Sequence, residues 1–545
     1  MRLRTLSALL LGFALGGCSA ASYRSSADDE AYEIVAERRR ELGTASRPFT
    51  IDVDAQTLRT EFEAAAASQP VSRTLDLRQA LLVAAENSRD YQRRKELVYL
   101  AALDLALEKF RFGFIPTVTG AGNVNGTAET ASDADASITG GVTRLLGSGA
   151  RIVSSIGVGL FRSLLTSEGW RTLPSSLALS VTQPLMRGFG SSIVREPLTQ
   201  AERNVLYEVR NFERFRQEFA VDVATRYYRV LQDANVIDNE KTNYENLKLV
   251  RERNEGLQAA GRLSDVEVGQ ARQNELSARN RWIVAQQSYA SRLDEFKIFL
   301  GLPTSAQMNL ADEELRKLAS DGMLAVEVKE ELSYGIALER RFDYHTARDR
   351  VVDATRKLRI AEDALRAGLG VTGSYNISSN EGQPSNFQGS DAPWSVGFDL
   401  DLPVYRLPER NAYRASLITL EVEKRAESLS RDNIRLDIRN SLRTLGQARE
   451  SYEIQKTAVS LAERRVEGAT LTLQAGRSST RDLLEAQEAL VQARNALTRN
   501  LVDYTLARLT LFSDLGALVL DDDGIRGDAE ALRQARGEVA AADTP

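Results

Sequence analysis

The sequence predicts a mainly α-helical protein with a membrane β-barrel part, built from one structural unit that occurs twice. Three observations carry this prediction: an internal repeat, two long proline-free stretches, and segments of alternating apolar and polar residues before each stretch. Prolines are absent from residues 198 to 302 and again from 409 to 544. A chain of 545 residues is long enough for several domains.

The repeat aligns Ala260–Gly301 with Ala475–Gly516 without a gap, at a separation of 215 residues, and 11 of the 42 aligned positions are identical. A separation of this size is too long for a solenoid repeat. It indicates a duplicated half-molecule. The identical pairs include Gly261 and Gly476, Arg262 and Arg477, Tyr289 and Tyr504, and the Leu-Gly pairs at 300–301 and 515–516.

The proline-free stretches predict very long helical hairpins. Both are rich in Ala, Leu, Glu, Arg and Gln, which favour helix. A helix of about 60 residues, a tip near Gly261 and a return helix to Leu300 would form a hairpin roughly 90–100 Å long. Two structural coiled-coil hairpins without a pore would give the same pattern. The apolar positions of the first stretch follow steps of three and four, as in a coiled-coil seam, at Val209, Phe212, Phe219, Val223, Tyr227, Val230, Ala234 and Ile237.

The segments before each hairpin alternate with period two and therefore predict strands. In "WSVGFDLDLPV", which begins at Trp394, one face is apolar and the other carries small residues and two aspartates. A soluble sandwich and a membrane barrel both give this alternation, and the very long helices favour the barrel. Residues 136–161 predict an extra hairpin that turns at residues 147–149, either as membrane strands or as an extracellular hairpin.

The first residues predict a lipoprotein. Residues 1–17 read as a signal peptide, with a basic start and an apolar run of ten residues that is too short to span a membrane. The following "LGGC" resembles the lipobox of bacterial lipoproteins, which implies a lipid, including palmitate, on Cys18. Ser19 then favours the outer membrane by resemblance to the lipoprotein sorting rule. A buried or free thiol is the alternative for this single cysteine, which in either case leaves no disulfide.

Composition and motifs indicate that the protein is not an enzyme. A formal net charge of −6 argues against nucleic acid as a partner. The sequence contains no glycine-rich phosphate loop, nucleophile motif or metal-ligand spacing. We therefore expect no catalytic residue, no cofactor and no metal.

The order of elements in each half resembles the TolC-like outer-membrane efflux channels, whose protomer is a duplicated strand–strand–hairpin unit. The resemblance covers residues 75–517. It implies a homotrimer with a 12-strand barrel and a periplasmic α-helical tunnel, working with a periplasmic adaptor and an inner-membrane pump. The function implied is a passive exit duct of a tripartite efflux or type I secretion system, and the rival is a lipid-anchored periplasmic coiled-coil scaffold without a pore. The matching motifs are "SVTQPLMRGFG" at 180–190, "DLDLPVYRLPERN" at 399–411, the two "AGR" tips and the two "LG" hairpin ends.

Acidic residues follow both predicted tips, and the resemblance implies that those of the second half form the narrowest ring of the channel. Asp482 and Glu485 are three residues apart and share a helix face. We expect these groups to form a periplasmic gate with nearby arginines, the alternative being an ordinary solvated helix turn. The candidate gate residues are Asp482, Glu485, Asp265, Glu267, Arg262 and Arg477.

The predicted domain plan has six parts. They are the signal peptide (1–17), the lipidated segment and linker (18–74), the first repeat (75–303, strands about 117–184, hairpin 190–301), a linker (304–331), the second repeat (332–517, strands about 371–404, hairpin 408–516) and a flexible tail (518–545).

Overall fold

The computed structural model divides the chain into two compact units, each of which collects three separate stretches of sequence. The first, which we call the sheet unit, comprises Met1–Ala45, Leu97–Val209 and Thr346–Ser428. The second, which we call the hairpin unit, comprises Ser46–Glu96, Arg210–His345 and Leu429–Pro545. The structure describes residues 19–43, 48–52, 73–127, 130–166, 169–321, 323, 326, 328–380, 383–387, 389, 392–402, 404–521 and 524–537. The predicted signal peptide and Cys18 lie outside these residues.

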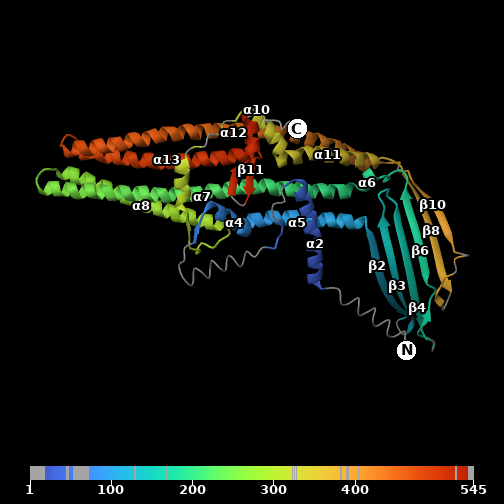
Figure 1. Cartoon of the computed structure of the whole chain (residues 1–545). Coiled ribbons are helices and arrows are strands. Elements are labelled where there is room, and N and C mark those ends of the chain that lie inside the picture. Colours follow the sequence, from blue (N-terminus) through green and yellow to red (C-terminus); the bar gives the residue numbers. More distant parts are fainter. Residues whose placement is uncertain are drawn as a thin grey trace, which may run out of the picture. The chain divides into compact units, whose positions relative to one another are not determined.

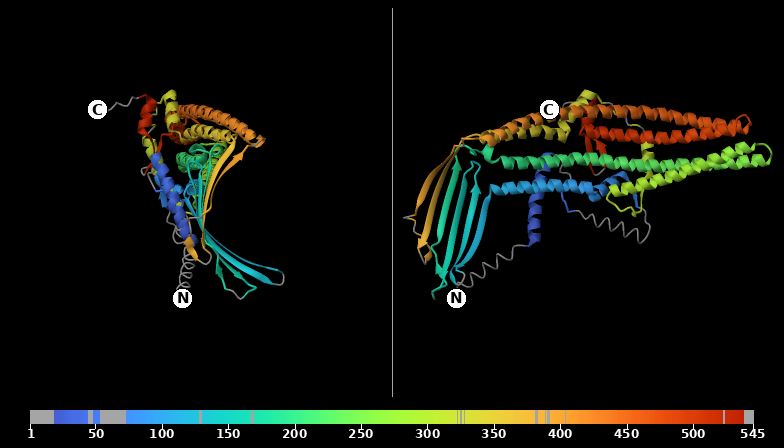
Figure 2. Two further views of the ribbon diagram at one scale, coloured as in Figure 1. Left: turned by 90° about the vertical axis from the view of Figure 1, so that its right-hand side faces the viewer. Right: turned by 180° about the vertical axis from the view of Figure 1, so that it is seen from behind.

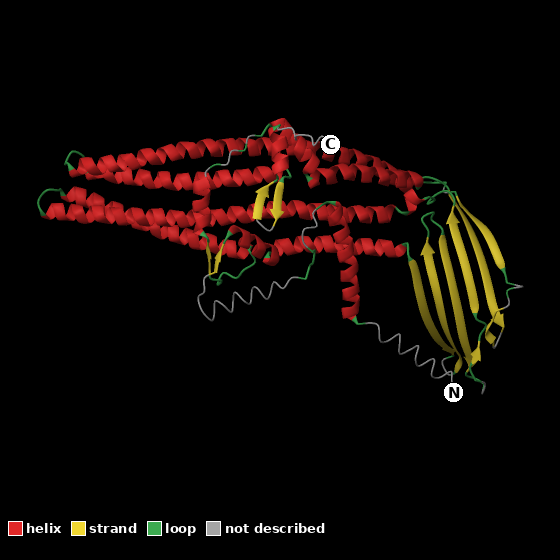
Figure 3. Ribbon diagram, viewed as in Figure 1, coloured by secondary structure: helices red, strands yellow, loops and turns green. Residues whose placement is uncertain are grey.

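The sheet unit contains six long strands in one antiparallel sheet, in the order β10-β8-β6-β4-β3-β2 (Figures 1 and 3). Two short strands, β5 (Arg171–Thr172) and β9 (Gln383–Phe387), pair with β4 and β8. The sheet is curved, as Figure 2 shows. The long strands are β2 (Phe114–Gly126), β3 (Ala131–Leu145), β4 (Arg151–Ser163), β6 (Ser176–Pro184), β8 (Gly368–Asn380) and β10 (Trp394–Asp401).

The extra hairpin predicted at residues 136–161 belongs to this sheet. β3 pairs with β4 from Asp133↔Ser163 to Leu145↔Arg151, and β4 pairs in turn with β6. The hairpin therefore consists of full-length strands inserted between β2 and β6. The predicted fold class is confirmed, but its strand count changes: the chain supplies six long strands, whereas a 12-strand barrel of three copies needs four. Sequence alternation alone could not decide whether these strands join the sheet, because pairing partners are a tertiary property.

Helices in the sheet unit include α2 (Ala20–Glu41), which packs on α5 (Arg89–Arg111). The hydroxyl of Tyr99 donates to Asp28 Oδ1 at 2.6 Å, and the rings of Tyr32 and Tyr99 are 5.7 Å apart. Helix α2 begins directly after Ser19, which caps it by accepting a hydrogen bond from the Ser22 amide.

Two long helical hairpins run through the chain, as predicted. Helix α7 (Glu196–Ala259) reverses into α8 (Asp265–Phe299), and α12 (Leu407–Gln474) reverses into α13 (Thr480–Asp514). Shorter helices precede the strands of each half: α4 (Leu77–Asn87) and α5 in the first, and α10 (Glu330–Arg340) and α11 (Phe342–Asp363) in the second. The predicted seam of α7 is buried at Val209, Phe212, Phe219, Val223, Tyr227 and Val230, each at most 5% exposed.

The predicted linker and tail contain regular structure. β1 (Arg73–Leu75) pairs in parallel with β7 (Met308–Leu310), and α9 (Asp312–Asp321) follows β7. Within the described residues, the predicted flexible tail contains regular structure up to the end of α14, because Ala531 and Ala535 are fully buried in a cluster with Ile336 and Leu511. Asp528 caps α14 and forms an ion pair with Arg340 at 2.6 Å. The tail elements are β11 (Leu518–Asp521), β12 (Gly524–Gly527) and α14 (Ala529–Arg536).

Candidate functional site

The strand register places one continuous apolar face across all six long strands. Val118 of β2 opposes Gly140 of β3, which in turn opposes Ile156 of β4. The alternation continues through Leu179 of β6 to the last strand. We call this surface the apolar face; its large side chains are 36% to 79% exposed. They are Val118, Val124, Ile138, Val142, Ile156, Val158, Leu160, Leu177, Leu179, Val181, Tyr375, Trp394, Val396, Phe398 and Leu400.

The opposite face of the sheet is polar and internally hydrogen-bonded. Asn123 donates to Asp135 at 3.0 Å and Asn125 donates to Asp133 at 2.9 Å, from β2 to β3. Between β8 and β10 the hydroxyls of Ser374 and Ser395 are 2.8 Å apart. The aspartates predicted to lie on the polar face of β10 are therefore joined by polar residues on the other strands.

A sheet in a soluble domain buries its apolar face and leaves the polar face in water, whereas no described residue of the sheet unit covers the apolar face of this sheet. Contiguous exposed apolar surface of this extent marks a contact with another apolar medium or molecule. Alternating apolar and polar strand faces are also the pattern of outer-membrane strands, with lipid on one side and water on the other. None of the described helices is long and apolar enough to cross a membrane.

The two sequence motifs at the strand-to-helix junctions contact each other. Arg187 of the first motif forms an ion pair with Asp401 of the second at 2.6 Å. The amide of Gly188 donates to Asp363 at 2.7 Å, which ties the junction to α11. These contacts therefore join the two halves of the chain at the end of the sheet where the long helices begin.

The hairpin tips repeat the same backbone geometry in both halves. Gly261 (φ 69°) and Gly476 (φ 68°) adopt the left-handed conformation that ends α7 and α12. The following amides of Arg262 and Arg477 donate to the carbonyls of Leu257 and Thr472, both at 2.9 Å. This is the Schellman arrangement, which satisfies the last carbonyls of a helix and normally requires glycine.

The acidic residues after the tips serve first as helix caps. Ser264 and Glu267 form a capping box at the start of α8, in which Glu267 accepts from the Ser264 amide at 3.3 Å. Ser479 and Asp482 form the equivalent box at the start of α13, with the matching hydrogen bond at 3.0 Å. The prediction missed these two serines, although the spacing Ser-x-x-Glu/Asp signals a capping box.

Two further acidic residues at the tips have side-chain partners within the same chain. Glu485 forms an ion pair with Arg481 at 2.8 Å, and Asp265 accepts a hydrogen bond from Gln258. Hydrogen bonds from the Ser479 amide and hydroxyl lower the pKa of Asp482, so this carboxylate stays ionised at neutral pH. The structure therefore groups Asp482 with Glu485 on the first turns of α13.

Helices α7 and α13 of the hairpin unit are joined by a ladder of polar side chains that the sequence analysis did not find. At its end near the tips, Asn254 donates to the hydroxyl of Thr480 at 3.2 Å, and both side chains are almost fully buried. The other rungs are Arg229–Asp503 at 2.6 Å, Thr498–Asn235 at 2.9 Å and Asn239–Asn495 at 2.8 Å. In the sequence, the available signal for this ladder was the presence of polar residues among the apolar positions predicted for α7.

Replacing Asn254 with alanine is expected to destabilise the protein by about 1–3 kcal/mol, because the buried Thr480 hydroxyl would lose its partner. Thermal unfolding in detergent, followed by circular dichroism, measures the change. Thr480→Val combined with Asn254→Ala should cost less than the two single changes together. As a control, the exposed Thr472→Val should change stability by less than about 0.5 kcal/mol; additive costs for Asn254 and Thr480 would rule out the coupling.

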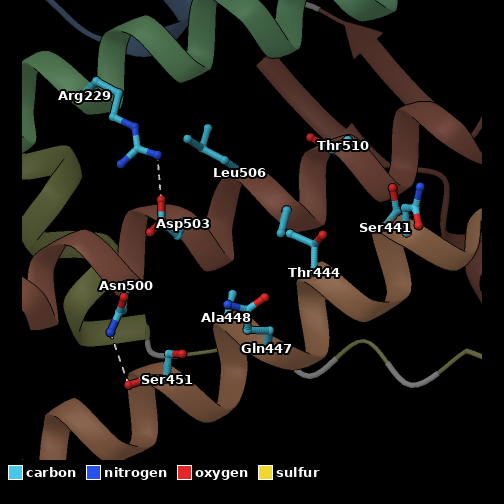
Figure 4. Close-up of a pocket in the computed structure, with 12 residues that line it drawn as sticks. Arg229, Ser441, Thr444, Gln447, Ala448, Ser451, Asn500, Asp503, Leu506 and Thr510 are labelled. Atoms are coloured by element: carbon cyan, nitrogen blue, oxygen red, sulfur yellow. Dashed lines mark hydrogen bonds and ion pairs between the residues drawn. The ribbon is translucent and has the colours of Figure 1, made fainter. Parts of the chain in front are cut away.

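A pocket of about 400 Å³ lies within the hairpin unit between α12 and α13 (Figure 4). Its charged groups are already paired, since Arg229 points to Asp503. Asn500 donates to the carbonyl of Ser451 at 3.2 Å. The rest of the lining consists mainly of hydroxyl, amide and alanine side chains, which offer no nucleophile–base pair. Among the described residues, no cluster of three or more His, Cys, Asp or Glu side chains could hold a metal ion.

Comparison with known proteins confirms the predicted resemblance. Residues 334–517 match the family model described as outer membrane efflux protein. No curated protein matches the chain in sequence. Three solved structures that share the fold are the Vibrio cholerae outer membrane protein VceC (14% identity, 81% of this chain and 96% of that chain, TM-score 0.59), the Campylobacter jejuni CmeC outer membrane channel (13%, 91% and 94%, 0.59) and the open state of the Neisseria gonorrhoeae MtrE outer membrane channel (14%, 81% and 88%, 0.57).

The chain therefore has the fold of outer membrane channels, and its second half carries the sequence features of the outer membrane efflux family. The exposed apolar face, the polar face behind it and the paired helical hairpins are the features of this fold that bear on its function.

Proposed function

We propose that three copies of this chain form an outer-membrane channel that acts as the passive exit duct of a tripartite efflux or type I secretion system. The observation that carries the proposal is the continuous apolar face of the six-stranded sheet, backed by a polar face. Lipid would cover the first face and water the second. An inner-membrane pump and a periplasmic adaptor would supply the cargo and the energy.

The rival function, a lipid-anchored periplasmic scaffold without a pore, predicts no contact between these strands and lipid hydrocarbon. Single-channel recording of the purified full chain in a planar bilayer separates the two. If the protein is a channel, the recordings should show discrete conductance steps, and the purified protein should be a trimer that needs detergent to stay in solution. A soluble, non-conducting protein in the absence of detergent would refute the proposal.

The lipid anchor forms a separate part of the proposal. We place the lipid on Cys18, which stands two residues before α2, and α2 packs on α5 through Tyr99 and Asp28. The lipid would then hold a helix that is already docked to the sheet unit. Mass spectrometry of the mature chain should find an acylated N-terminus at Cys18; an unmodified Met1 would exclude this anchor, whereas the strands would still supply their own apolar band.

The tip carboxylates would control the closed state of the channel. Asp482 and Glu485 contribute two negative charges per copy at the start of α13, and fixed charges around a narrow mouth concentrate counter-ions. Neutralising both as Asp482→Asn and Glu485→Gln should weaken cation selectivity and block by divalent cations. These replacements keep oxygen acceptors, so the cap at Ser479 is retained. Reversal potentials across a salt gradient, at low ionic strength, measure the effect.

Two controls make this test specific to charge at the mouth. The effect should shrink at ~1 M salt, where the screening length is only ~3 Å. Neutralising the acidic pair that follows the first tip, as Asp265→Asn and Glu267→Gln, should have the smaller effect. Wild-type selectivity in the second-half variant, with altered selectivity in the first-half variant, would move the gate to the first tip around Arg262.

A further inference from the structure

Both outer edges of the sheet are unpaired in the single chain. Among the described strands, none pairs with the outer edge of β2 or of β10. β2 is 13 residues long and contains no charged residue, and β10 contains no lysine or arginine. Soluble proteins protect such edges with charges, bulges or covering segments, since an open edge is a template for another strand. Such protection is limited to Pro116 and a register shift at Asn125/Gly126 in β2, and to Asp399 and Asp401 near the end of β10.

The directions of the two edges suit pairing between copies of this chain. Each neighbouring pair in the order β10-β8-β6-β4-β3-β2 is antiparallel, so the five steps leave β2 and β10 running in opposite directions. β10 of one copy can therefore pair with β2 of the next as an antiparallel ladder. Such a head-to-tail contact closes into a ring when the rotation allows it. The apolar face would continue across the contact, because Val118 and Phe398 lie on the same side of the sheet.

We infer that three copies close an 18-strand barrel, with β3 and β4 of each copy as full members of the membrane wall. This inference rests on the proposed channel function and concerns the width of its exit. Its basis is the register, in which β4 lies between β3 and β6, with seven residue pairs to β6 and thirteen to β3. A hairpin outside the membrane would not separate β2 from β6 along the whole wall.

The turn between β3 and β4 is built into the base of the sheet. The hydroxyl of Ser148 donates to Gln183 at 3.0 Å, and the Gly190 amide donates to the Ser148 carbonyl at 3.3 Å. Gly149 has φ of 93°, and an added Cβ would lie 2.8 Å from the carbonyl oxygen of Gly188. The turn therefore packs on the strand-to-helix junction, which fixes β3 and β4 in register with β6.

In the inserted strands β3 and β4, apolar and polar side chains lie on the same two faces as in the other strands of the sheet. Ile138 and Val158 oppose each other on the apolar face, and Asp135 opposes Phe161 on the other. β3 and β4 contain 15 and 13 residues, which exceeds the 9–11 residues that a tilted strand needs to cross a bilayer. The lengths of β3 and β4 and the orientation of their apolar side chains both suit strands that cross a membrane.

Six strands per copy would widen the exit. With strands ~4.8 Å apart and tilted by ~40°, 12 strands give a backbone radius of about 12 Å and 18 strands about 18 Å. Side chains take about 5 Å of each radius, half the spacing of packed sheets, which leaves about 7 Å and 13 Å. The lumen of the membrane part would therefore be nearly twice as wide as in a 12-strand barrel and would admit polypeptide-sized cargo.

Electron cryomicroscopy of the full chain in lipid nanodiscs, together with native mass spectrometry, tests the inference. The expected result is three copies, 18 strands and direct pairing of β10 with β2 of the next copy. A matched variant in which a short glycine-serine loop replaces residues 128–173 removes β3, β4 and β5 and leaves four long strands. Its barrel should contain 12 strands, and the wild-type backbone radius should be about 1.5-fold larger.

The outcomes separate this inference from the proposed function. A conducting trimer whose wild-type wall holds 12 strands, with β3 and β4 outside the wall, overturns the inference and leaves the channel intact. Two copies that together close 12 strands also overturn it. A protein that neither inserts nor conducts refutes the channel itself. The wild-type strand count decides the question even if the shortened variant fails to fold.

Discussion

Replacing Gly301 with alanine is expected to cost about 3–5 kcal/mol, the largest loss among the four glycines that end the hairpin helices. Gly301 ends the first hairpin with φ of 80°, and an added Cβ would overlap the backbone carbonyl of Asn87, lying 2.6 Å from its carbon. Both residues belong to the hairpin unit. The backbone of Asn87 cannot change rotamer as a side chain can. The C-terminal end of α4 must therefore move, or the end of the hairpin must unwind. The thermal midpoint in detergent and the yield in the membrane fraction measure the loss.

The duplication supplies matched controls for this prediction. Gly261 and Gly476 have φ of 69° and 68° but face open space, so alanine there should cost only about 1–2 kcal/mol for the left-handed conformation. Gly516 is intermediate, since its added Cβ would lie 3.1 Å from Arg340. Equal losses at Gly261 and Gly301 would show that backbone conformation, and not packing, decides the cost.

Replacing Leu179 with arginine is expected to prevent stable insertion of the sheet. Leu179 lies in the central strand β6, on the apolar face opposite Tyr375 of β8. A charged side chain on the lipid face costs about 2–4 kcal/mol per chain at the bilayer midplane, and three copies would carry it. The amount of chain recovered in the membrane fraction, and its conductance in a planar bilayer, should both fall.

Ser180→Arg is the control, because the next residue of the same strand lies on the polar face and opposes Ser374. A water-facing arginine should leave insertion unchanged and alter only ion selectivity. If Leu179→Arg inserts as well as Ser180→Arg, or makes the protein more soluble without loss of conductance, the apolar face does not contact lipid.

The sequence by itself determined the architecture of each half. Period-two segments and long proline-free stretches predicted the strands and hairpins, because side-chain periodicity follows local backbone geometry. The 215-residue repeat also located the glycines that end the helices: Gly261, Gly301, Gly476 and Gly516 all have positive φ in the structure. These features are local, so they can be read without knowing what packs against them.

The tertiary structure alone decided which strands are neighbours and which tip groups are already engaged. Strand pairing between Leu179 of β6 and Tyr375 of β8 joins residues far apart in sequence, and the alternation along a strand is the same whichever strand lies beside it. Likewise the carboxylates that the sequence groups as a gate divide into caps, such as Glu267 and Asp482, and a side-chain ion pair at Glu485. Hydrogen-bonding partners depend on positions in space, which periodicity along the chain does not specify.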